Sequence, residues 1–172
     1  MKNQFPIGKY EIPKDIKKEQ VKLWINQIKT LSQRIAQVTV NLNENQLTQQ
    51  YREGSWDVRT LIHHIADSHL HGYIRTKLIL TENCPSVSTF EENEWFKLSD
   101  NKNDINDSIM MITGIHNRWV KVLESLNDEQ FERSMHHPEN GLVPLKQMIS
   151  LYAWHGEHHL QHIKIALEKL EK

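Results

Sequence analysis

Apolar residues recur at three- and four-residue spacing along four long stretches of the chain. The first covers residues 15–42, and its apolar positions are Val21, Trp24, Ile25, Ile28, Leu31, Ile35, Val38 and Leu42. This spacing places one apolar stripe along a helix, with Asp15 as its N-cap. The second stretch predicts a helix from a Ser55 cap to about Thr81. Its stripe contains Val58, Leu61, Ile62, Ile65, Ile74 and Leu78.

The third and fourth stretches follow two long polar connections. Residues 104–126 carry inward positions at Ile105, Ile109, Ile112, Ile115, Trp119, Val122 and Leu126. Pro144 suits the first turn of a fourth helix that continues to about Glu171. The connection at 83–103 is long enough to hold a short helix, and turn residues within 127–143 suggest a small hairpin. The pattern predicts an all-α fold, a four-helix bundle of one domain over residues 1–172, and leaves its topology open.

Composition excludes several classes of partner. The chain has 172 residues, which is enough to bury a core without disulfides. Its formal net charge is -1, with 21 Lys and Arg against 22 Asp and Glu, so no basic field would attract nucleic acid or anionic lipid. We find no signal peptide and no membrane span, and Cys84 has no pairing partner. These features predict a cytoplasmic protein.

Histidine is the compositional anomaly of this sequence. There are 11 histidines, and four of them lie between His155 and His162 within the fourth predicted helix. Residues four apart lie on one face of a helix, so His155 and His159 can direct two imidazole nitrogens at one point. His162 lies about 20° from His155 around the helix axis, and His158 lies about 60° to the other side. The pattern therefore predicts a two-point metal clamp.

A third ligand is available in the second predicted helix, at His63 or His64. These two side chains point about 100° apart, so at most one faces the clamp, and the apolar pattern alone does not decide between them. Three neutral imidazoles suit zinc, nickel or another borderline transition metal, and they leave a coordination position for water or substrate. Asp67, one turn after His64, is a candidate acceptor for a ring N–H.

The remaining polar residues near this pattern receive weaker assignments. Glu157 falls on the far side of the fourth helix, where we expect it to be solvated. His71 and His162 are candidates for proton transfer or support of the ligands. His69, His116 and His136 are interpreted as ordinary hydrogen-bonded histidines of the core or surface. The sequence contains no Cys-x-x-Cys, His-Glu-x-x-His or Glu-x-x-His motif, so the predicted site holds one ion among nitrogen ligands.

The chain resembles the DinB/YfiT superfamily of metalloenzymes, in particular its YfiT-like branch. The resemblance spans the whole chain. It rests on Phe5-Pro6-Ile7-Gly8-Lys9-Tyr10, Tyr51-Arg52, Trp56, Val58-Arg59, His63-His64-Ile65-Ala66-Asp67-Ser68-His69, Tyr73-Ile74-Arg75, Lys77-Leu78, His137-Pro138, Trp154-His155, His158-His159 and His162.

The resemblance implies a four-helix bundle that binds one zinc or nickel ion through His64, His155 and His159. It thereby selects His64 over His63, because His64 directly precedes the Ile-Ala-Asp segment. Members of the superfamily are described as metal-dependent hydrolases, and relatives are transferases or isomerases that use bacillithiol, mycothiol or glutathione. The resemblance also implies a homodimer acting on a small-molecule substrate. The alternatives are a metal-binding bundle without catalysis and a structural interaction domain.

Overall fold

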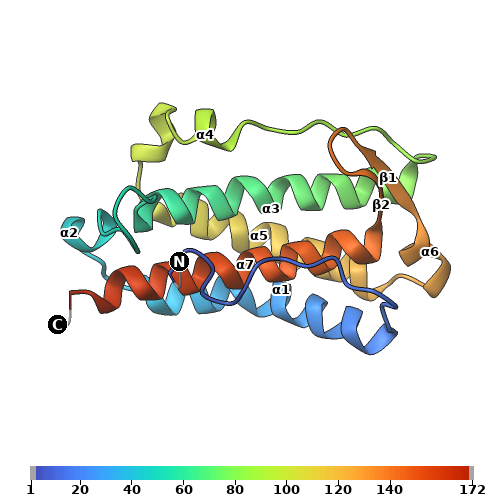
Figure 1. Cartoon of the computed structure of the whole chain (residues 1–172), viewed down its shortest axis with the longest axis horizontal. Coiled ribbons are helices and arrows are strands. Elements are labelled where there is room, and N and C mark those ends of the chain that lie inside the picture. Colours follow the sequence, from blue (N-terminus) through green and yellow to red (C-terminus); the bar gives the residue numbers. More distant parts are fainter. Residues whose placement is uncertain (1–2, 171–172) are drawn as a thin grey trace.

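Four long helices form a bundle in the computed structural model, which describes residues 3–170 (Figure 1). They are α1 (Lys18–Val38), α3 (Val58–Thr81), α5 (Ile105–Glu124) and α7 (Leu145–Glu168). Each corresponds to one of the four amphipathic stretches in the sequence, since an apolar stripe at helical spacing is buried by packing helices against one another. The predicted four-helix fold is confirmed.

The helices of the bundle do not pack in the order of the chain. Both α1 and α3 pack against α5 and α7, so α1 lies diagonally opposite α3, and α5 lies diagonally opposite α7. In Figure 1, α1 and α7 run in one direction, and α3 and α5 run in the other. The two histidine-rich helices, α3 and α7, are therefore antiparallel neighbours. This topology was left open by the apolar pattern.

The core is built from the predicted stripes. Ile28, Leu31 and Ile35 of α1 are almost completely buried, as are many stripe residues of the other long helices. Burial of each such side chain stabilises the fold by about 1.5–3 kcal/mol. The prediction for Ile74 is wrong, because 45% of this residue is exposed. Within residues 3–170, the helices lack the combination of length and apolarity that spanning a membrane requires.

Two helix starts differ from the predicted ones. Helix α1 begins at Lys18 with Lys17 as its N-cap, whereas Asp15 precedes it with a positive φ of 49°. Helix α3 is capped by Asp57, whose Oδ1 accepts the N–H of Thr60 at 2.8 Å. The Ser55 hydroxyl instead donates to the carbonyl of Arg52, inside the preceding turn. Both predicted caps were wrong by two residues, and for α3 the reason is that Ser55 and Asp57, two suitable capping residue types, stand close together.

The connections contain short elements that partly match the predictions. The segment between α3 and α5 runs back along the bundle (Figure 1) and holds α4 (Glu92–Trp95) and the 3-10 helix η1 (Ser99–Lys102). Two further short helices, α2 (Glu44–Leu47) and α6 (Asp128–Glu132), were not predicted. The suggested hairpin is present.

This hairpin leads directly into the last helix. Its strands β1 (Ser134–His137) and β2 (Gly141–Pro144) pair antiparallel. Gly141 has a φ of 66°, which suits the turn. Pro144 then stands at the N-cap of α7, one position before the predicted place in its first turn.

The N-terminal segment lies along α7. The Tyr10 hydroxyl is 2.8 Å from Ser150 Oγ, and the Tyr10 ring packs against Trp154 with centroids 5.7 Å apart. Farther along α7, the ring of Phe5 lies 6.1 Å from that of His158. This segment therefore covers one side of the helix that carries most of the clustered histidines.

Candidate metal centre

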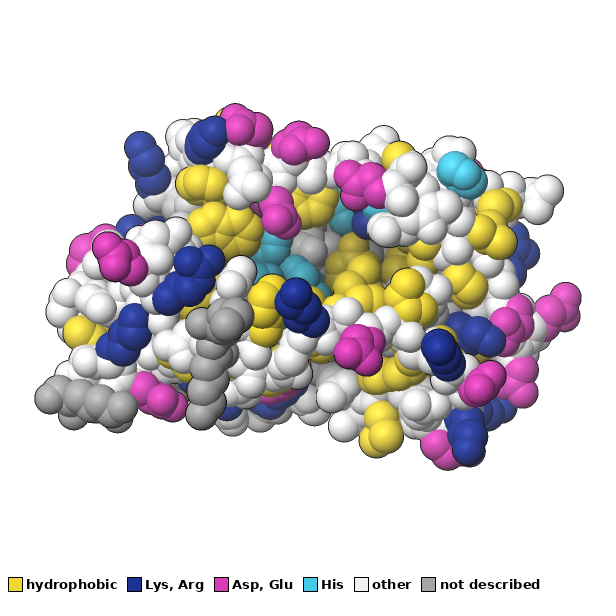
Figure 2. Space-filling model, in the orientation of Figure 1, with side chains coloured by type: hydrophobic (Ala, Val, Ile, Leu, Met, Phe, Trp, Pro, Cys, Tyr) yellow, Lys and Arg dark blue, Asp and Glu magenta, His cyan; other side chains and the backbone are white. Residues whose placement is uncertain are grey.

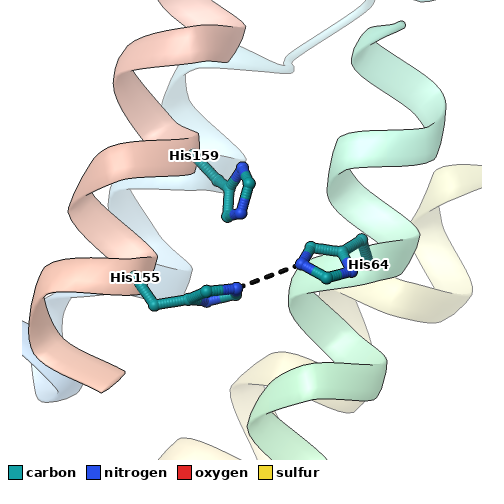
Figure 3. A group of neighbouring side chains, drawn as sticks. All are labelled: His64, His155 and His159. Atoms are coloured by element: carbon teal, nitrogen blue, oxygen red, sulfur yellow. Dashed lines mark hydrogen bonds between the residues drawn. The ribbon is translucent and has the colours of Figure 1, made fainter. Parts of the chain in front are cut away.

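Three histidines from two helices converge at one point of the bundle (Figure 3). His64 projects from α3, and His155 and His159 project from successive turns of α7. Each offers one ring nitrogen, and the three nitrogens lie within 4.8 Å of one another. The Nε2 atoms of His64 and His155 are 3.0 Å apart. Because α3 and α7 are antiparallel neighbours, a pair four residues apart on α7 can face a single residue of α3.

Aromatic packing and a close helix approach fix the positions of these rings. Trp56 packs on His64 with centroids 4.7 Å apart and on His159 at 6.4 Å. Next to His155, Gly156 allows α7 to approach α1, since a Cβ at this position would lie 2.3 Å from Cδ2 of Leu31. The cluster is thus held by packing on both helices.

The three imidazoles are neutral at pH 7. Burial lowers the pKa of His64 to about 4. Burial also holds the pKa of His155 and of His159 well below the usual value, and the neighbouring imidazoles lower both further. A neutral imidazole keeps the lone pair that a metal ion requires, so this environment favours metal binding over protonation.

The geometry of the three nitrogens fits a transition-metal ion. Zn–N bonds of about 2.0–2.1 Å in a tetrahedral arrangement place the ligand nitrogens roughly 3.4 Å apart, which is compatible with the observed spacing. The donor set contains nitrogen alone, with no thiolate or carboxylate in the group. Such a set suits zinc, nickel or a similar borderline ion, and poorly suits calcium or magnesium.

A hollow in the molecular surface reaches this cluster. Figure 2 shows histidine side chains gathered at its base, between apolar and acidic groups. On one side a cavity of about 330 Å³ is lined by His159, His158 and His162. Tyr51, Arg52 and Trp56 complete much of its wall. A small molecule can therefore reach His159 from solvent.

His158, His159 and His162 form a second close group, with ring nitrogens also within 4.8 Å. Both ring nitrogens of His162 already face a hydrogen-bond partner. Nδ1 of His162 lies 3.4 Å from Nδ1 of His159, and its Nε2 lies 3.3 Å from the carbonyl of Gln4. The His162 ring also stacks on Tyr51, with centroids 3.7 Å apart. His162, a candidate for support, thus directly neighbours His159.

His63 and His71 lie apart from the cluster. His63 Nδ1 is 2.7 Å from Ser108 Oγ of α5, and the His63 ring lines a separate cavity of about 240 Å³ that contains several aspartates. The ring of His71 stacks on Phe90 with centroids 4.4 Å apart. Of the two, His64 and not His63 therefore lies next to His155 and His159.

Asp67 does not make the expected contact. No hydrogen bond connects Asp67 with His64 in the described chain. The carboxyl group instead lines two cavities, a small one that it shares with His64 and the acidic one beside His63. Burial, with a smaller contribution from the charge of Asp100, raises the pKa of Asp67 to about 6. Asp67 thus ionises near neutral pH at the edge of the cluster.

Glu157 lies away from the cluster, as predicted, but it is not simply solvated. It is half-buried and accepts a hydrogen bond from Arg34 of α1. Its other oxygen accepts from the Gln161 amide at 2.7 Å. Glu157 therefore joins α7 to α1 and takes no part in the histidine group.

Two histidines at the centre were missed by the sequence interpretation. His69 Nε2 lies 3.4 Å from Nδ1 of His155, and His69 Nδ1 lies 2.8 Å from Nε2 of His116. They are 0% and 1% exposed. The expectation that both are hydrogen-bonded core residues holds, but their partners lead to His155. A signal was present for His116, because it lies four residues after Ile112 and three before Trp119, on the apolar face of the helix.

Comparison with known proteins places this site in a family. The model of the DinB superfamily matches residues 27–163. A Halalkalibacterium halodurans protein named "putative metal-dependent hydrolase" is 46% identical over 167 residues, covering 97% of this chain and 98% of the relative. An Oceanobacillus iheyensis protein of the same description is 40% identical over 163 residues, with 95% of each chain covered.

Two solved structures share the fold. YfiT from Bacillus subtilis, described as "a probable metal-dependent hydrolase with an unusual four-helix bundle topology", matches with a TM-score of 0.94 and 35% identity over 99% of both chains. A mycothiol-dependent maleylpyruvate isomerase matches with a TM-score of 0.66 and 12% identity, over 83% of this chain and 60% of the isomerase, which shows similarity of fold alone. The extent of the family match and the identity to whole-length relatives show that this chain belongs to the DinB superfamily.

Proposed function

We propose that this protein is a metal-dependent hydrolase in which His64, His155 and His159 bind one divalent ion, zinc or nickel. The observation that carries the proposal is the convergence of three neutral imidazole nitrogens, of which the His159 ring lines a surface cavity. The descriptions of the whole-length relatives support the reaction class. Three protein ligands leave a coordination position for a reactant, which is the arrangement of a catalytic site.

The protein residues around the ion have separate tasks. The ion, when bound, supplies a Lewis acid that favours the deprotonated form of water or of a small thiol at neutral pH. Trp56 packs on two of the ligand rings and limits their movement. Asp67 lines the small cavity next to His64, and its pKa of about 6 suits a group that accepts a proton from the reactant.

A second candidate reaction is transfer of a low-molecular-weight thiol to an electrophile. The cavity beside His159 favours it, because a volume of about 330 Å³ can hold a small molecule next to the ion. The exposed Arg52 in its wall could pair with an acidic group of such a thiol. The homodimer and the cytoplasmic location stay predictions.

Metal content tests the ligand set. We expect the wild-type protein to retain one equivalent of zinc or nickel after dialysis, and His64→Ala, His155→Ala and His159→Ala each to lose it. His63→Ala is the matched control, because His63 is the chain neighbour of His64 but faces Ser108. Stoichiometric metal in all three ligand variants would contradict the proposal.

Turnover separates the candidate reactions. The metal-loaded protein is assayed with a panel of amides and esters, and separately with bacillithiol or glutathione and a panel of electrophiles. Metal-dependent hydrolysis supports the proposal, whereas thiol conjugation alone favours the second candidate. If neither reaction exceeds that of the metal-free protein, the bundle binds metal without catalysing these reactions.

A further inference from the structure

We infer that His69 and His116 are positioning residues that hold His155 in the tautomer whose Nε2 is free to bind the metal ion. This inference rests on the proposed metal site. It concerns two buried histidines that would not themselves contact the ion. Together with His155 they form a line of three imidazoles that joins α7, α3 and α5, which we call the imidazole relay.

The contacts of the relay alternate between the two nitrogens of each ring. His155 presents Nε2 to His64 and Nδ1 to His69, at 3.0 Å and 3.4 Å. The His69 ring uses Nε2 toward His155 and Nδ1 toward His116, at 2.8 Å for the latter contact. A neutral imidazole has one donor nitrogen and one acceptor nitrogen. The tautomer of one ring therefore determines that of the next.

Metal binding would determine which nitrogen of each relay ring carries the proton, and thus the direction in which the rings donate. If Nε2 of His155 binds the ion, its proton is on Nδ1 and is donated to Nε2 of His69. His69 must then carry its own proton on Nδ1, which donates to Nε2 of His116. His116 in turn carries its proton on Nδ1. A metal-ligating histidine usually donates its other N–H to an acceptor that fixes the ring orientation, and His69 is placed to be that acceptor.

The surroundings of His116, the relay ring farthest from the ion, favour the same direction of donation. Burial lowers the pKa of His116 to about 4, and the backbone carbonyl of Ile28 in α1 acts against this shift, because it favours a proton on the ring. Since Nε2 of His116 faces His69, Nδ1 is the nitrogen left for that proton. Nδ1 of His116 is buried and makes no hydrogen bond of regular geometry in this structure, and the opposite direction would place its lone pair on the side of the carbonyl. Two acceptors facing each other are unfavourable in a buried site.

Packing prevents the relay rings from turning to other partners. The His69 ring lies edge-on to Tyr152, with centroids 5.3 Å apart, and to Trp119 at 6.1 Å. All of these side chains are buried, so exchange of the hydrogen bonds with bulk solvent is blocked. The ring orientations are therefore set within the core.

The other α7 ligand has a similar, shorter arrangement. Nδ1 of His159 faces Nδ1 of His162 at 3.4 Å, and Nε2 of His162 faces the carbonyl of Gln4 at 3.3 Å. That carbonyl can only accept, so His162 carries its proton on Nε2 and offers Nδ1 as an acceptor for His159. Both α7 ligands thus have a second histidine that can accept their Nδ1–H. This parallel strengthens the assignment for His69 and His116.

Nitrogen NMR of the full chain tests the tautomers directly. In the ¹⁵N-labelled, zinc-loaded protein we expect His155, His69 and His116 each to carry the proton on Nδ1. A proton on Nε2 of His69 would overturn the inference, because that nitrogen could not accept from His155. If the wild-type protein bound neither zinc nor nickel, the proposed metal site would fail. Zinc binding with the opposite tautomers would overturn only the relay.

Zinc affinity, measured by chelator competition, tests the consequence. We expect His69→Leu to weaken zinc binding by about 10–100-fold, the usual effect of losing such a supporting contact. His69→Gln keeps an acceptor near the position of Nε2 and is expected to restore most of the affinity. Thr76→Val is the matched core control, because it removes the partner of Trp119 but leaves the relay intact. It should lower the unfolding temperature and leave zinc affinity close to wild type.

Two results in this series would contradict the relay. One is wild-type zinc affinity in His69→Leu. The other is an equal loss of affinity in Thr76→Val and His69→Leu, which would indicate a general effect of core damage. If His69→Leu does not fold, His116→Leu and His116→Gln provide the same comparison one ring farther from the ion.

Discussion

Asp67 is a residue beside the histidine cluster whose carboxyl group ionises near neutral pH. Its carboxyl group lies between the small cavity that it shares with His64 and the acidic cavity that contains Asp100. Burial, with a contribution from Asp100, raises its pKa to about 6. A carboxylate with this pKa is ionised at pH 7 and is a stronger base than an ordinary aspartate.

Replacement of Asp67 by Asn is expected to lower kcat by about 100-fold or more, because the amide cannot accept a proton. Metal content should stay at the wild-type level, since no contact joins Asp67 to His64. In the wild type, activity should fall as pH drops through about 6, where the Asp67 carboxylate becomes protonated. Measurement of kcat, metal content and the pH profile checks these expectations.

Asp100→Asn serves as the control for this prediction. It removes the negative charge that helps to raise the Asp67 pKa, so the acidic limb of the profile should move to lower pH while activity at pH 7 is retained. Unchanged kcat in Asp67→Asn would argue against a proton-accepting role for this residue.

At the residue scale, the sequence predicted which histidines lie together better than it predicted their surroundings. His155 and His159 could be paired because helical spacing fixes which side chains share a face. The contacts of His69 and His116 could not be predicted, because they cross from α3 to α5 and depend on how the helices pack. A periodic pattern identifies a face but does not identify the partner opposite it.

At the element scale, the apolar pattern predicted all four long helices, and it was less informative about their ends and order. Asp57 caps α3, although Ser55 is an equally suitable residue type two positions earlier. The diagonal placement of α1 opposite α3 and of α5 opposite α7 depends on the long connections, which carry little periodic signal. Close contacts between helices also depend on small residues whose role is invisible in one sequence.

Gly72 of α3 is such a residue. A Cβ built on it would lie 2.5 Å from Trp119 and within 2.9 Å of two Tyr152 ring atoms. These rings are buried and rigid, so we expect Gly72→Ala to destabilise the fold by about 1–3 kcal/mol through overpacking. Gly114→Ala on α5 is the control, because nothing lies within 4 Å of a Cβ there.

The control should change stability in the opposite direction. Ala is favoured over Gly inside a helix by about 0.5–1 kcal/mol, so Gly114→Ala is expected to stabilise the protein. Urea denaturation of both variants measures the two free energies. A stabilised Gly72→Ala protein would show that α3 can move away from Trp119 and Tyr152 at little cost.

At the scale of the whole molecule, buried neutral histidines make stability depend on pH. His116 is 1% exposed, and burial lowers its pKa from 6.5 to about 4. The unfolded chain therefore takes up this proton at a higher pH than the folded chain does. The stabilisation is fully present above about pH 6.5 and is lost as pH falls toward 4.

We therefore expect the free energy of unfolding of the metal-free protein to fall on acidification. His116 alone accounts for roughly 3 kcal/mol by pH 4. Urea denaturation between pH 7.5 and 4 measures the slope, and the slope should be smaller in His116→Gln. Equal slopes in the two proteins would mean that His116 is not neutral in the folded state over this range.

The proposed ion would also link α3 to α7, helices that are distant in the sequence. Because the ion binds the folded arrangement of His64, His155 and His159, it should raise the unfolding free energy by about 2.7 kcal/mol when free zinc is 100 times its Kd. For a protein of this size, that corresponds to a rise in Tm of roughly 5–10 °C.

His64→Ala should abolish this zinc-dependent rise in Tm, and His63→Ala should retain it. Calorimetry with and without a chelator checks both expectations. The same rise in wild type and His64→Ala would show that zinc stabilises the bundle from another site, most simply the neighbouring group of His158, His159 and His162. A rise that disappears in His64→Ala but persists in His162→Ala would locate the stabilising ion between α3 and α7, because His64 is the ligand that α3 contributes.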